Sequence, residues 1–193
     1  TKLLRKNILT DEEREEYLGI IEEEMKRLYT MANGILNLTK VENQSILTNV
    51  TEYNLSEQIR LTVLLLESKW TARNINMNID FGEYTINANE EMMKQVWINL
   101  LDNAIKFSPE GEEISIRISN KNEHIYVSIS GKGPHIEDEE INKIFRKFYQ
   151  SDSSHSTEGT GIGLALVSRI IELHKGRIEV NSDKNINTFT VIL

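Results

Sequence analysis

The feature that most constrains the fold of this chain is an apolar repeat that runs from Leu18 to Ile35. Apolar residues recur there at alternating spacings of three and four, while charged residues such as Glu22 and Arg27 fall outside the repeat. This spacing is typical of the buried seam of a coiled coil. The residues of the seam are Leu18, Ile21, Met25, Leu28, Ala32 and Ile35.

The helix that carries this seam is predicted to be long. Residues 2–9 are predicted to form the end of a preceding helix. Thr10 and Glu13 are predicted to form a capping box that starts the next helix. A helix of roughly 30 residues is about 45 Å long, which is more than a small domain covers on one side. We therefore expect a homodimer through this helix. The alternative is an amphipathic helix that packs on its own domain.

Beyond a linker near residues 43–49, helices and strands alternate without a strict parallel repeat. This order predicts an α+β fold, a two-layer α/β sandwich in which a mixed sheet carries three helices on one face, preceded by the long coiled-coil-type helix. Residues 1–43 and 50–193 are the two expected domains. Helices are predicted over 56–73, from an Asn89 cap to before Pro109, and over 137–145 and 163–174. Strands are predicted over 50–53, 76–81, 112–120, 124–130, 178–181 and 188–193.

The composition excludes several classes of function. The chain has 30 acidic and 22 basic residues among 193, a formal net charge of −8, which argues against a nucleic-acid surface. It has no cysteine, so disulfides and thiolate chemistry are ruled out. The longest apolar run, Val63 to Leu66, is far short of the roughly 20 residues of a membrane span. Because the chain starts at Thr1 inside an apparent helix, we expect it to be a fragment of a larger protein. The lack of cysteine is consistent with a cytoplasmic location, which we also expect.

The segment from Trp97 to Ser108 places three polar side chains on one helix face. Asn99 and Asn103 are one turn apart, and Lys106 follows three residues later. A carboxamide oxygen suits magnesium and an ammonium suits phosphate. The alternative is a helix whose polar face is only solvated.

Three glycines precede the apolar helix of the C-terminal part. Gly159, Gly161 and Gly163 would let backbone amides approach an anion at the N-terminus of that helix, and phosphate is the obvious anion. A flexible loop is the alternative for such a segment. The polar stretch 151–158 comes directly before it and is expected to act as a mobile lid.

Four segments, in this order, resemble the motifs of sensor histidine kinases of two-component systems. Residues 97–108 resemble the N box, 127–136 the first glycine box, 144–150 the phenylalanine box and 159–164 the second glycine box. The resemblance runs from about residue 10 to the C-terminus. It implies a partial dimerisation hairpin followed by an ATP-binding domain of the Bergerat, or GHKL, type.

The resemblance also implies roles for individual residues. Asn103 would ligate Mg2+ with support from Asn99, Lys106 would neutralise phosphate oxygens, and Phe107 would pack beside adenine, although core packing is an equal alternative for Phe107. Lys147 could contact the terminal phosphate, but an ordinary surface charge is the more common meaning of a lysine at such a position. The remaining nucleotide-binding positions are Gly131, Gly133, Gly159, Thr160, Gly161, Gly163 and Leu164.

The implied reaction transfers the γ-phosphoryl of ATP to a histidine upstream of this chain, and then to an aspartate of a response regulator receiver domain. The four histidines, at 124, 135, 155 and 174, all lie outside the dimerisation hairpin. The phosphoacceptor helix is therefore missing from residues 1–43. The full-length protein is expected at the inner face of the cell membrane, anchored by a segment upstream.

The first glycine box departs from the pattern of the family. Gly131 stands where an aspartate normally reads the exocyclic amine of adenine, and His135 stands where a small residue is usual. Losing such a charge-assisted bond costs about 1.5–3 kcal/mol. Asn185 and Asn187 replace glycines of a third motif, a mild change because Asn tolerates left-handed backbone. Gly131 supports one alternative, a degenerate pseudokinase or dimerisation module that binds ATP weakly or not at all. A separate alternative is another ATPase of the same nucleotide-binding fold.

Overall fold

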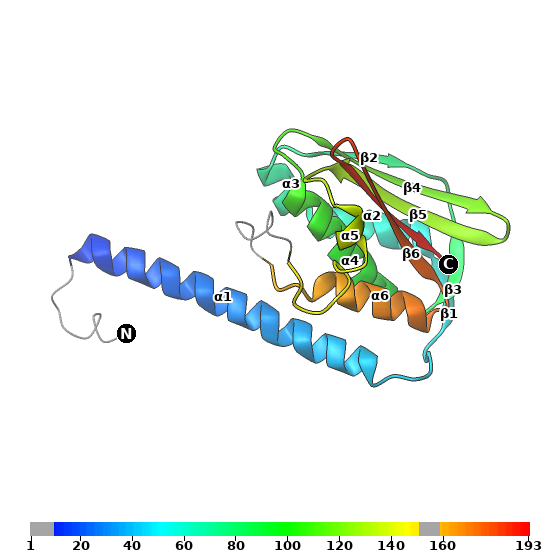
Figure 1. Cartoon of the computed structure of the whole chain (residues 1–193), viewed down its shortest axis with the longest axis horizontal. Helices are drawn as coiled ribbons and strands as arrows, with labels where there is room; N and C mark the ends of the chain where they lie inside the picture. Colours follow the sequence, from blue (N-terminus) through cyan, green and yellow to red (C-terminus); the bar gives the residue numbers. More distant parts are fainter. Residues whose placement is uncertain (1–9, 151–158) are drawn as a thin grey trace.

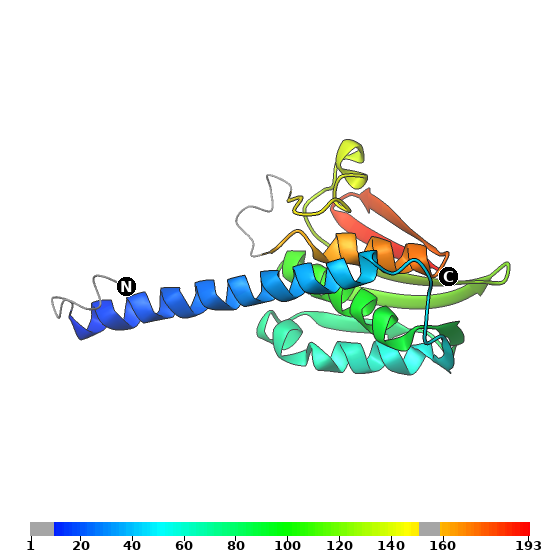
Figure 2. The same cartoon turned by 90° about the horizontal axis from the view of Figure 1, so that it is seen from below.

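A long helix, α1 (Asp11–Glu42), leads into a compact α/β body (Figures 1 and 2). The structure is a computed structural model that describes residues 10–150 and 159–193. The capping box is confirmed, because the Thr10 side chain accepts from Glu13 N–H while the Glu13 carboxylate accepts from Thr10 N–H at 2.8 Å. The helical end predicted over residues 2–9 lies outside the described residues. In the described part of the chain, no helix is both long enough and apolar enough to cross a membrane.

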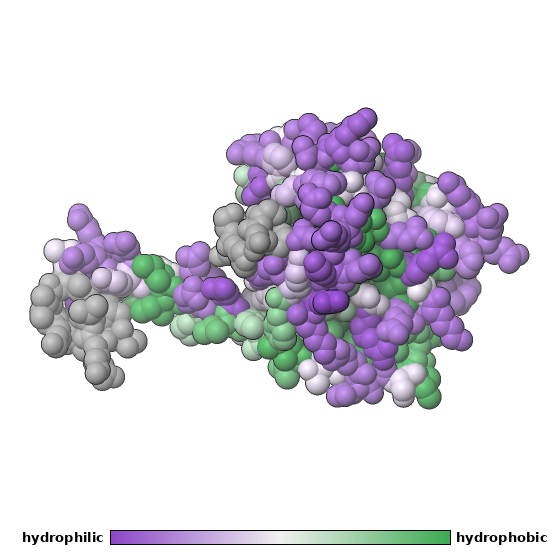
Figure 3. All heavy atoms as spheres, viewed as in Figure 1, coloured by the Kyte–Doolittle hydropathy of each residue, from purple (hydrophilic) through white to green (hydrophobic). Residues whose placement is uncertain are grey.

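Only the C-terminal end of α1 is buried in the body. Leu38 and Val41 belong to the hydrophobic core, whereas Met25 and Leu28 of the seam are 65% and 63% exposed. Figure 3 shows apolar surface between polar groups along the protruding part of the helix. The seam is therefore largely not covered by the chain's own body, and its pairing with another copy stays a prediction. The division into domains at residues 43–50 stays a prediction.

The main sheet has five strands in the order β2-β4-β5-β7-β6. The edge strand β2 (Asn76–Asp80) pairs in parallel with β4 (Glu113–Lys121), and the other pairs are antiparallel, so the sheet is mixed as predicted. Both predicted hairpins are present: β4 with β5 (His124–Lys132), and β6 (Arg177–Asp183) with β7 (Ile186–Ile192). A separate two-stranded sheet joins β1 (Thr51–Asn54) to β3 (Thr85–Ala88), a strand that the sequence pattern did not indicate.

Three helices cover one face of this sheet, which confirms the predicted sandwich (Figure 2). They are α2 (Leu55–Leu65), α4 (Glu90–Phe107) and α6 (Gly163–Leu173). The core between the two layers includes the fully buried Trp97 of α4 and isoleucines of β4 and β5. The Asn89 side chain caps α4 by accepting from Met92 N–H at 3.0 Å, and the helix ends before Pro109, both as predicted.

Two predicted helices are shorter than expected. The helix predicted over 56–73 breaks at Leu66 into α2 and α3 (Glu67–Ala72), because the indole of Trp70 donates to the Val63 carbonyl at 3.0 Å and takes up an acceptor of the last turn. The helix predicted over 137–145 survives only as α5 (Asp138–Ile141). Beyond it, Arg146 N–H donates to the Lys143 carbonyl, a three-residue spacing that gives tight turns in place of an α-helix.

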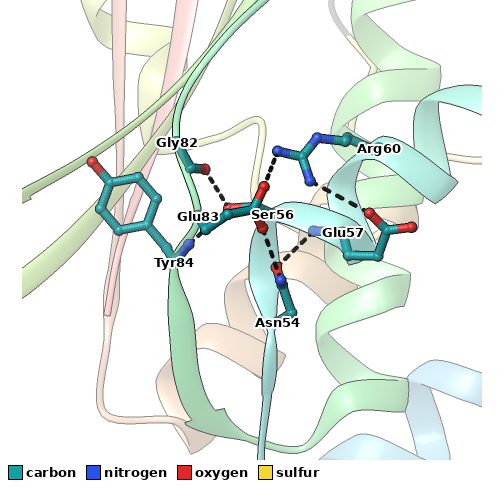
Figure 4. A network of polar contacts seen from close by, with 7 residues as sticks. All are labelled: Asn54, Ser56, Glu57, Arg60, Gly82, Glu83 and Tyr84. Carbon is teal, nitrogen blue, oxygen red and sulfur yellow. Dashed lines mark hydrogen bonds and ion pairs between the residues drawn. The ribbon is translucent and has the colours of Figure 1, made fainter.

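A polar network fixes the start of α2 against the strand that follows residue 82 (Figure 4). The fully buried Ser56 hydroxyl donates to the Gly82 carbonyl at 2.8 Å and accepts from Tyr84 N–H at 3.0 Å. On the exposed side, Arg60 pairs with Glu83, and this hydrogen bond lowers the pKa of the Glu83 carboxyl. The network holds the small β1-β3 sheet to the helix layer.

Candidate nucleotide-binding site

A cleft of about 510 Å3 opens between α4, the glycine-bearing segment before α6, and the ends of β5 and β7. Polar residues of α4 lie at one end of the cleft, and Gly131, near the end of β5, lies at the other. Of the site residues predicted from the sequence, those that line it are Asn99, Asn103, Lys106, Phe107, Gly131, Gly159, Thr160, Gly161, Gly163 and Leu164.

The polar face of α4 supplies one wall of the cleft. Asn99, Asn103 and Lys106 all line it, as their helical spacing predicts. The Asn99 amide is oriented by its own helix, because its Nδ2 donates to the Gln95 carbonyl at 2.7 Å. That leaves the Asn99 Oδ1 atom to face the segment before α6. The Lys106 Nζ atom lies 4.6 Å from the centre of the Phe107 ring, a cation-π distance.

On the opposite wall of the cleft, the backbone at two glycines lies very close to polar side chains of α4. A Cβ on Gly163 would lie 2.6 Å from Asn99 Oδ1, and a Cβ on Gly159 would lie 2.6 Å from Lys106 Nζ. Both distances are far below van der Waals contact. The Lys106 ammonium ends a flexible side chain and can move aside, whereas the Asn99 amide is held by its bond to Gln95, so the close approach favours glycine most strongly at position 163. The polar tips of α4 therefore meet bare backbone at the start of α6. This cradle fits a phosphate with a bound Mg2+ ion, because amide oxygens, an ammonium and backbone amides are suitable partners for that group.

Gly161 has a conformational role as well. Its φ of +66° is left-handed, and a Cβ there would lie 2.7 Å from the carbonyl carbon of Phe148. The two segments are joined directly, since Phe148 N–H donates to the Gly161 carbonyl at 2.8 Å and the Gln150 side chain donates to the Gly159 carbonyl at 2.6 Å. The phenylalanine-box segment thereby holds the glycine segment in place beside the cleft.

The other end of the cleft is built by β5 and β7. Gly131 of β5 faces Asn187 of β7 in the antiparallel register, and both residues line the cleft. His135 also lines it, and its Nδ1 atom is 2.9 Å from the Ser182 hydroxyl. Asn185 has a φ of +65°, which is the left-handed backbone conformation expected at a position where asparagine replaces glycine. Asn187 lies in the regular strand β7 and needs another explanation.

The structure does not bring Gly133 and Lys147 to the cleft surface. Lys147 instead pairs through Nζ with the Glu42 carboxylate at 2.7 Å, which ties the turn after α5 to the end of α1. Gly133 lies behind the lining, where a Cβ would be 3.8 Å from Phe107 Cβ. The sequence pattern did not place Asn187 in the cleft, nor Lys69 and four residues of α1 that line it: Glu23, Lys26, Arg27 and Thr30. No local pattern could have found the α1 residues, because their placement depends on how α1 packs on the body.

Comparison with known proteins agrees with this geometry. Residues 88–193 match the family described as histidine kinase-, DNA gyrase B-, and HSP90-like ATPase. The sensor histidine kinase CusS of Escherichia coli O6:H1 is 28% identical over 173 residues, which cover 89% of this chain and 36% of CusS. The chain thus spans just over a third of the length of this relative.

Solved structures share the fold. The catalytic domain of the histidine kinase ThkA is 32% identical, with a TM-score of 0.69 over 76% of this chain and 95% of that domain. A structure of ThkA in complex with the response regulator protein TrrA is 29% identical, with a TM-score of 0.81 over 100% of this chain and 54% of that one. The chain belongs to the histidine kinase-, DNA gyrase B-, and HSP90-like ATPases, and within them to the sensor histidine kinases.

Proposed function

We propose that this chain binds Mg-ATP in the cleft and serves as the catalytic part of a protein-histidine kinase. The observation that carries the proposal is the meeting of two independent elements in one cleft. The polar face of α4 comes within contact of the glycine segment before α6, although the two are some 60 residues apart in the chain. Two unrelated stretches with phosphate-binding chemistry are brought together only by the fold.

Each residue of this wall has a task that follows from its chemistry. Asn103, with Asn99 beside it, would hold Mg2+ through amide oxygens. The ion, when bound, would neutralise charge on the phosphates during transfer. Lys106 would stabilise phosphate charge from the side of Phe107, and the backbone amides near Gly161 and Gly163 would bind phosphate oxygens at the start of α6. Catalysis of this kind consists of positioning and charge stabilisation, and it needs no base from these residues.

The proposed phosphoacceptor is a histidine on a helix upstream of α1. Transfer breaks the bond between the γ-phosphorus and the bridging oxygen of ATP and forms a phosphorus–nitrogen bond to the imidazole, leaving ADP. The phosphoryl group then passes to an aspartate of a response regulator receiver domain. ThkA, which shares the fold over the whole of this chain, is seen bound to a response regulator protein. We propose that pairing of the exposed α1 seam forms the homodimer in which this transfer occurs.

Calorimetric titration with a non-hydrolysable ATP analogue, in the presence and absence of magnesium, tests the nucleotide site. Asn103→Ala should abolish the magnesium-dependent part of binding, while the exposed Asn181→Ala on β6 should leave it unchanged. Equal magnesium dependence in the Asn103 variant and the parent chain would contradict the assignment of α4 to the metal and phosphate side.

A further inference from the structure

We infer that Asn187 reads the exocyclic amine of the nucleotide base and so makes the site selective for 6-amino purines. This inference rests on the proposed function, because it concerns the base of the nucleotide whose phosphates α4 would bind. Nothing in the motif pattern of the chain assigns a role to Asn187. Three properties of Asn187 support the role: its position, the orientation of its amide and the unpaired state of its amide oxygen.

The position of Asn187 is directly across from the missing aspartate. Gly131 and Asn187 are partners in the β5-β7 register, so their side-chain positions lie on the same face of the sheet. The next partners on that face are Ile129 and Phe189, which also line the cleft. The Asn187 side chain therefore starts from the strand beside the position that Gly131 leaves without a side chain.

The amide of Asn187 has a fixed direction. Its Nδ2 donates to the Pro134 carbonyl at 2.8 Å, and a Cβ on Gly133 would lie only 2.9 Å from the same nitrogen. The turn after β5 thus closes over the nitrogen end of the amide. Since the Pro134 carbonyl can only accept, this contact decides that the nitrogen faces the turn and the oxygen is the end left for another partner.

The oxygen of this amide has no donor in the described parts of the chain. Asn187 Oδ1 is shielded from solvent and accepts no hydrogen bond there, although the residue as a whole is only half-buried and lines the cleft. A shielded acceptor without a partner is unfavourable, and a ligand that brings a donor relieves it. The terminal torsion of Asn is soft, so a rotation small enough to keep the Nδ2 contact with Pro134 would open Oδ1 to a base in the cleft.

The chemistry of the acceptor selects the base. A 6-amino group donates a hydrogen bond to Oδ1, whereas the 6-oxo group of hypoxanthine or guanine would set one acceptor against another. A site built to bind a hydrogen-bond donor rejects an analogue without one, because its buried polar group stays unpaired. Asn187 would thereby replace, with a neutral amide, part of the recognition that an aspartate at position 131 would give.

The test compares ATP with ITP, which differs by having a 6-oxo group, in magnesium-containing calorimetric titrations. The parent chain should bind ATP about tenfold or more tightly than ITP. Asn187→Ala should bring the ratio close to one by weakening ATP, with ITP affinity held within about threefold. Urea unfolding of Asn187→Ala shows whether the variant is folded, so that a loss of ATP preference is not a general loss of folding. Asn181→Ala serves as the control.

The outcomes separate this inference from the proposed function. Equal affinity of the parent chain for ATP and ITP, or an unchanged ATP preference in Asn187→Ala, would overturn the role of Asn187 and leave the nucleotide site standing. Absence of binding of either nucleotide would overturn the proposed function, and this inference with it.

A second arm uses Gly131→Asp. If Asn187 already supplies the acceptor, the substitution should tighten ATP binding less than about threefold in the parent chain but about tenfold or more in Asn187→Ala. A Cβ on Gly131 would lie 3.3 Å from Ile114 Cγ1, a tight but tolerable contact. Equal gains in both backgrounds would show that the two positions do not share a ligand, and would overturn the inference.

Discussion

The Oδ1 atom of Asn99 lies 2.6 Å from the point that a Cβ on Gly163 would occupy. Asn99 cannot simply swing away, because its Nδ2 is bonded to the Gln95 carbonyl. Gly163→Ala should therefore break that bond, destabilise the chain by about 1 kcal/mol and weaken nucleotide binding about tenfold or more. Urea unfolding and calorimetric titration with an ATP analogue measure the two effects.

Gly19 offers a matched control for this substitution. It also lies in a helix, but a Cβ there would have no atom within 4 Å. Gly19→Ala should raise helix stability by about 0.5–1 kcal/mol and leave nucleotide binding unchanged. A stabilising effect of alanine at both positions would mean that the contact between Asn99 and the start of α6 does not constrain the site.

His174 gives the stability of the body a dependence on pH. Its Nε2 accepts from Asn89 N–H at 3.1 Å and its Nδ1 donates to the Ile170 carbonyl at 2.7 Å, so the ring is neutral. Burial lowers the pKa of His174 below its usual 6.5. The unfolded chain therefore takes up a proton before the folded chain does, and this contribution to stability is complete above pH 6.5 and is lost as pH falls toward the folded pKa.

The measurement is urea unfolding between pH 7.5 and 5. The His174 contribution should fall by at most about 1.4 kcal/mol per pH unit below the ordinary pKa. His174→Gln should flatten the dependence in this range, whereas the exposed His124→Gln should not. An equal slope in the parent chain and the His174 variant would rule out His174 as the source.

The sequence predicted best the elements whose ends are set by local contacts. Thr10 and Asn89 cap their helices with their own side chains, and Pro109 ends α4 because it cannot continue the helix. The strand β3 could not be found in this way. It has four residues, and its pairing with β1 joins residues 31 to 37 positions apart, so a local sequence pattern does not reveal the burial that stabilises it.

The same distinction between local and distant contacts holds for the residues of the candidate site. Asn99, Asn103 and Lys106 share a helix face at fixed spacing, so their meeting in one cleft followed from the sequence. Lys147 and Asn187 did not follow. Lys147 forms an ion pair with Glu42 of a helix distant in the sequence. The proposed role of Asn187 depends on its cross-strand partner and on the turn at Pro134. Departures from a motif, such as Gly131, were the best available signal that a compensating residue lies elsewhere.

The buried hydroxyl of Ser56 should be a strong contributor to the stability of the body. Ser56→Ala leaves the part-buried Tyr84 N–H without its acceptor and should cost about 1–3 kcal/mol in the free energy of unfolding. Glu57→Gln changes a neighbouring exposed ion pair with Arg60, in which the closest atoms are 3.4 Å apart, and should cost less than about 1 kcal/mol. Similar costs in urea unfolding would mean that the network of Figure 4 is held by its exposed charges.

The exposed seam of α1 predicts self-association. Met25 and Leu28 are largely exposed within one chain, and we expect them to be buried against a second copy. Met25→Glu and Leu28→Glu together should shift the chain toward monomer, raising the dissociation constant by about tenfold or more, because each would place a charge in the seam. Sedimentation over a range of concentrations measures this constant.

Ile20→Glu also replaces an exposed apolar residue of α1, but it lies outside the seam and should leave the constant unchanged. A parent chain that stays monomeric at the highest concentration would show that α1 alone does not form the dimer.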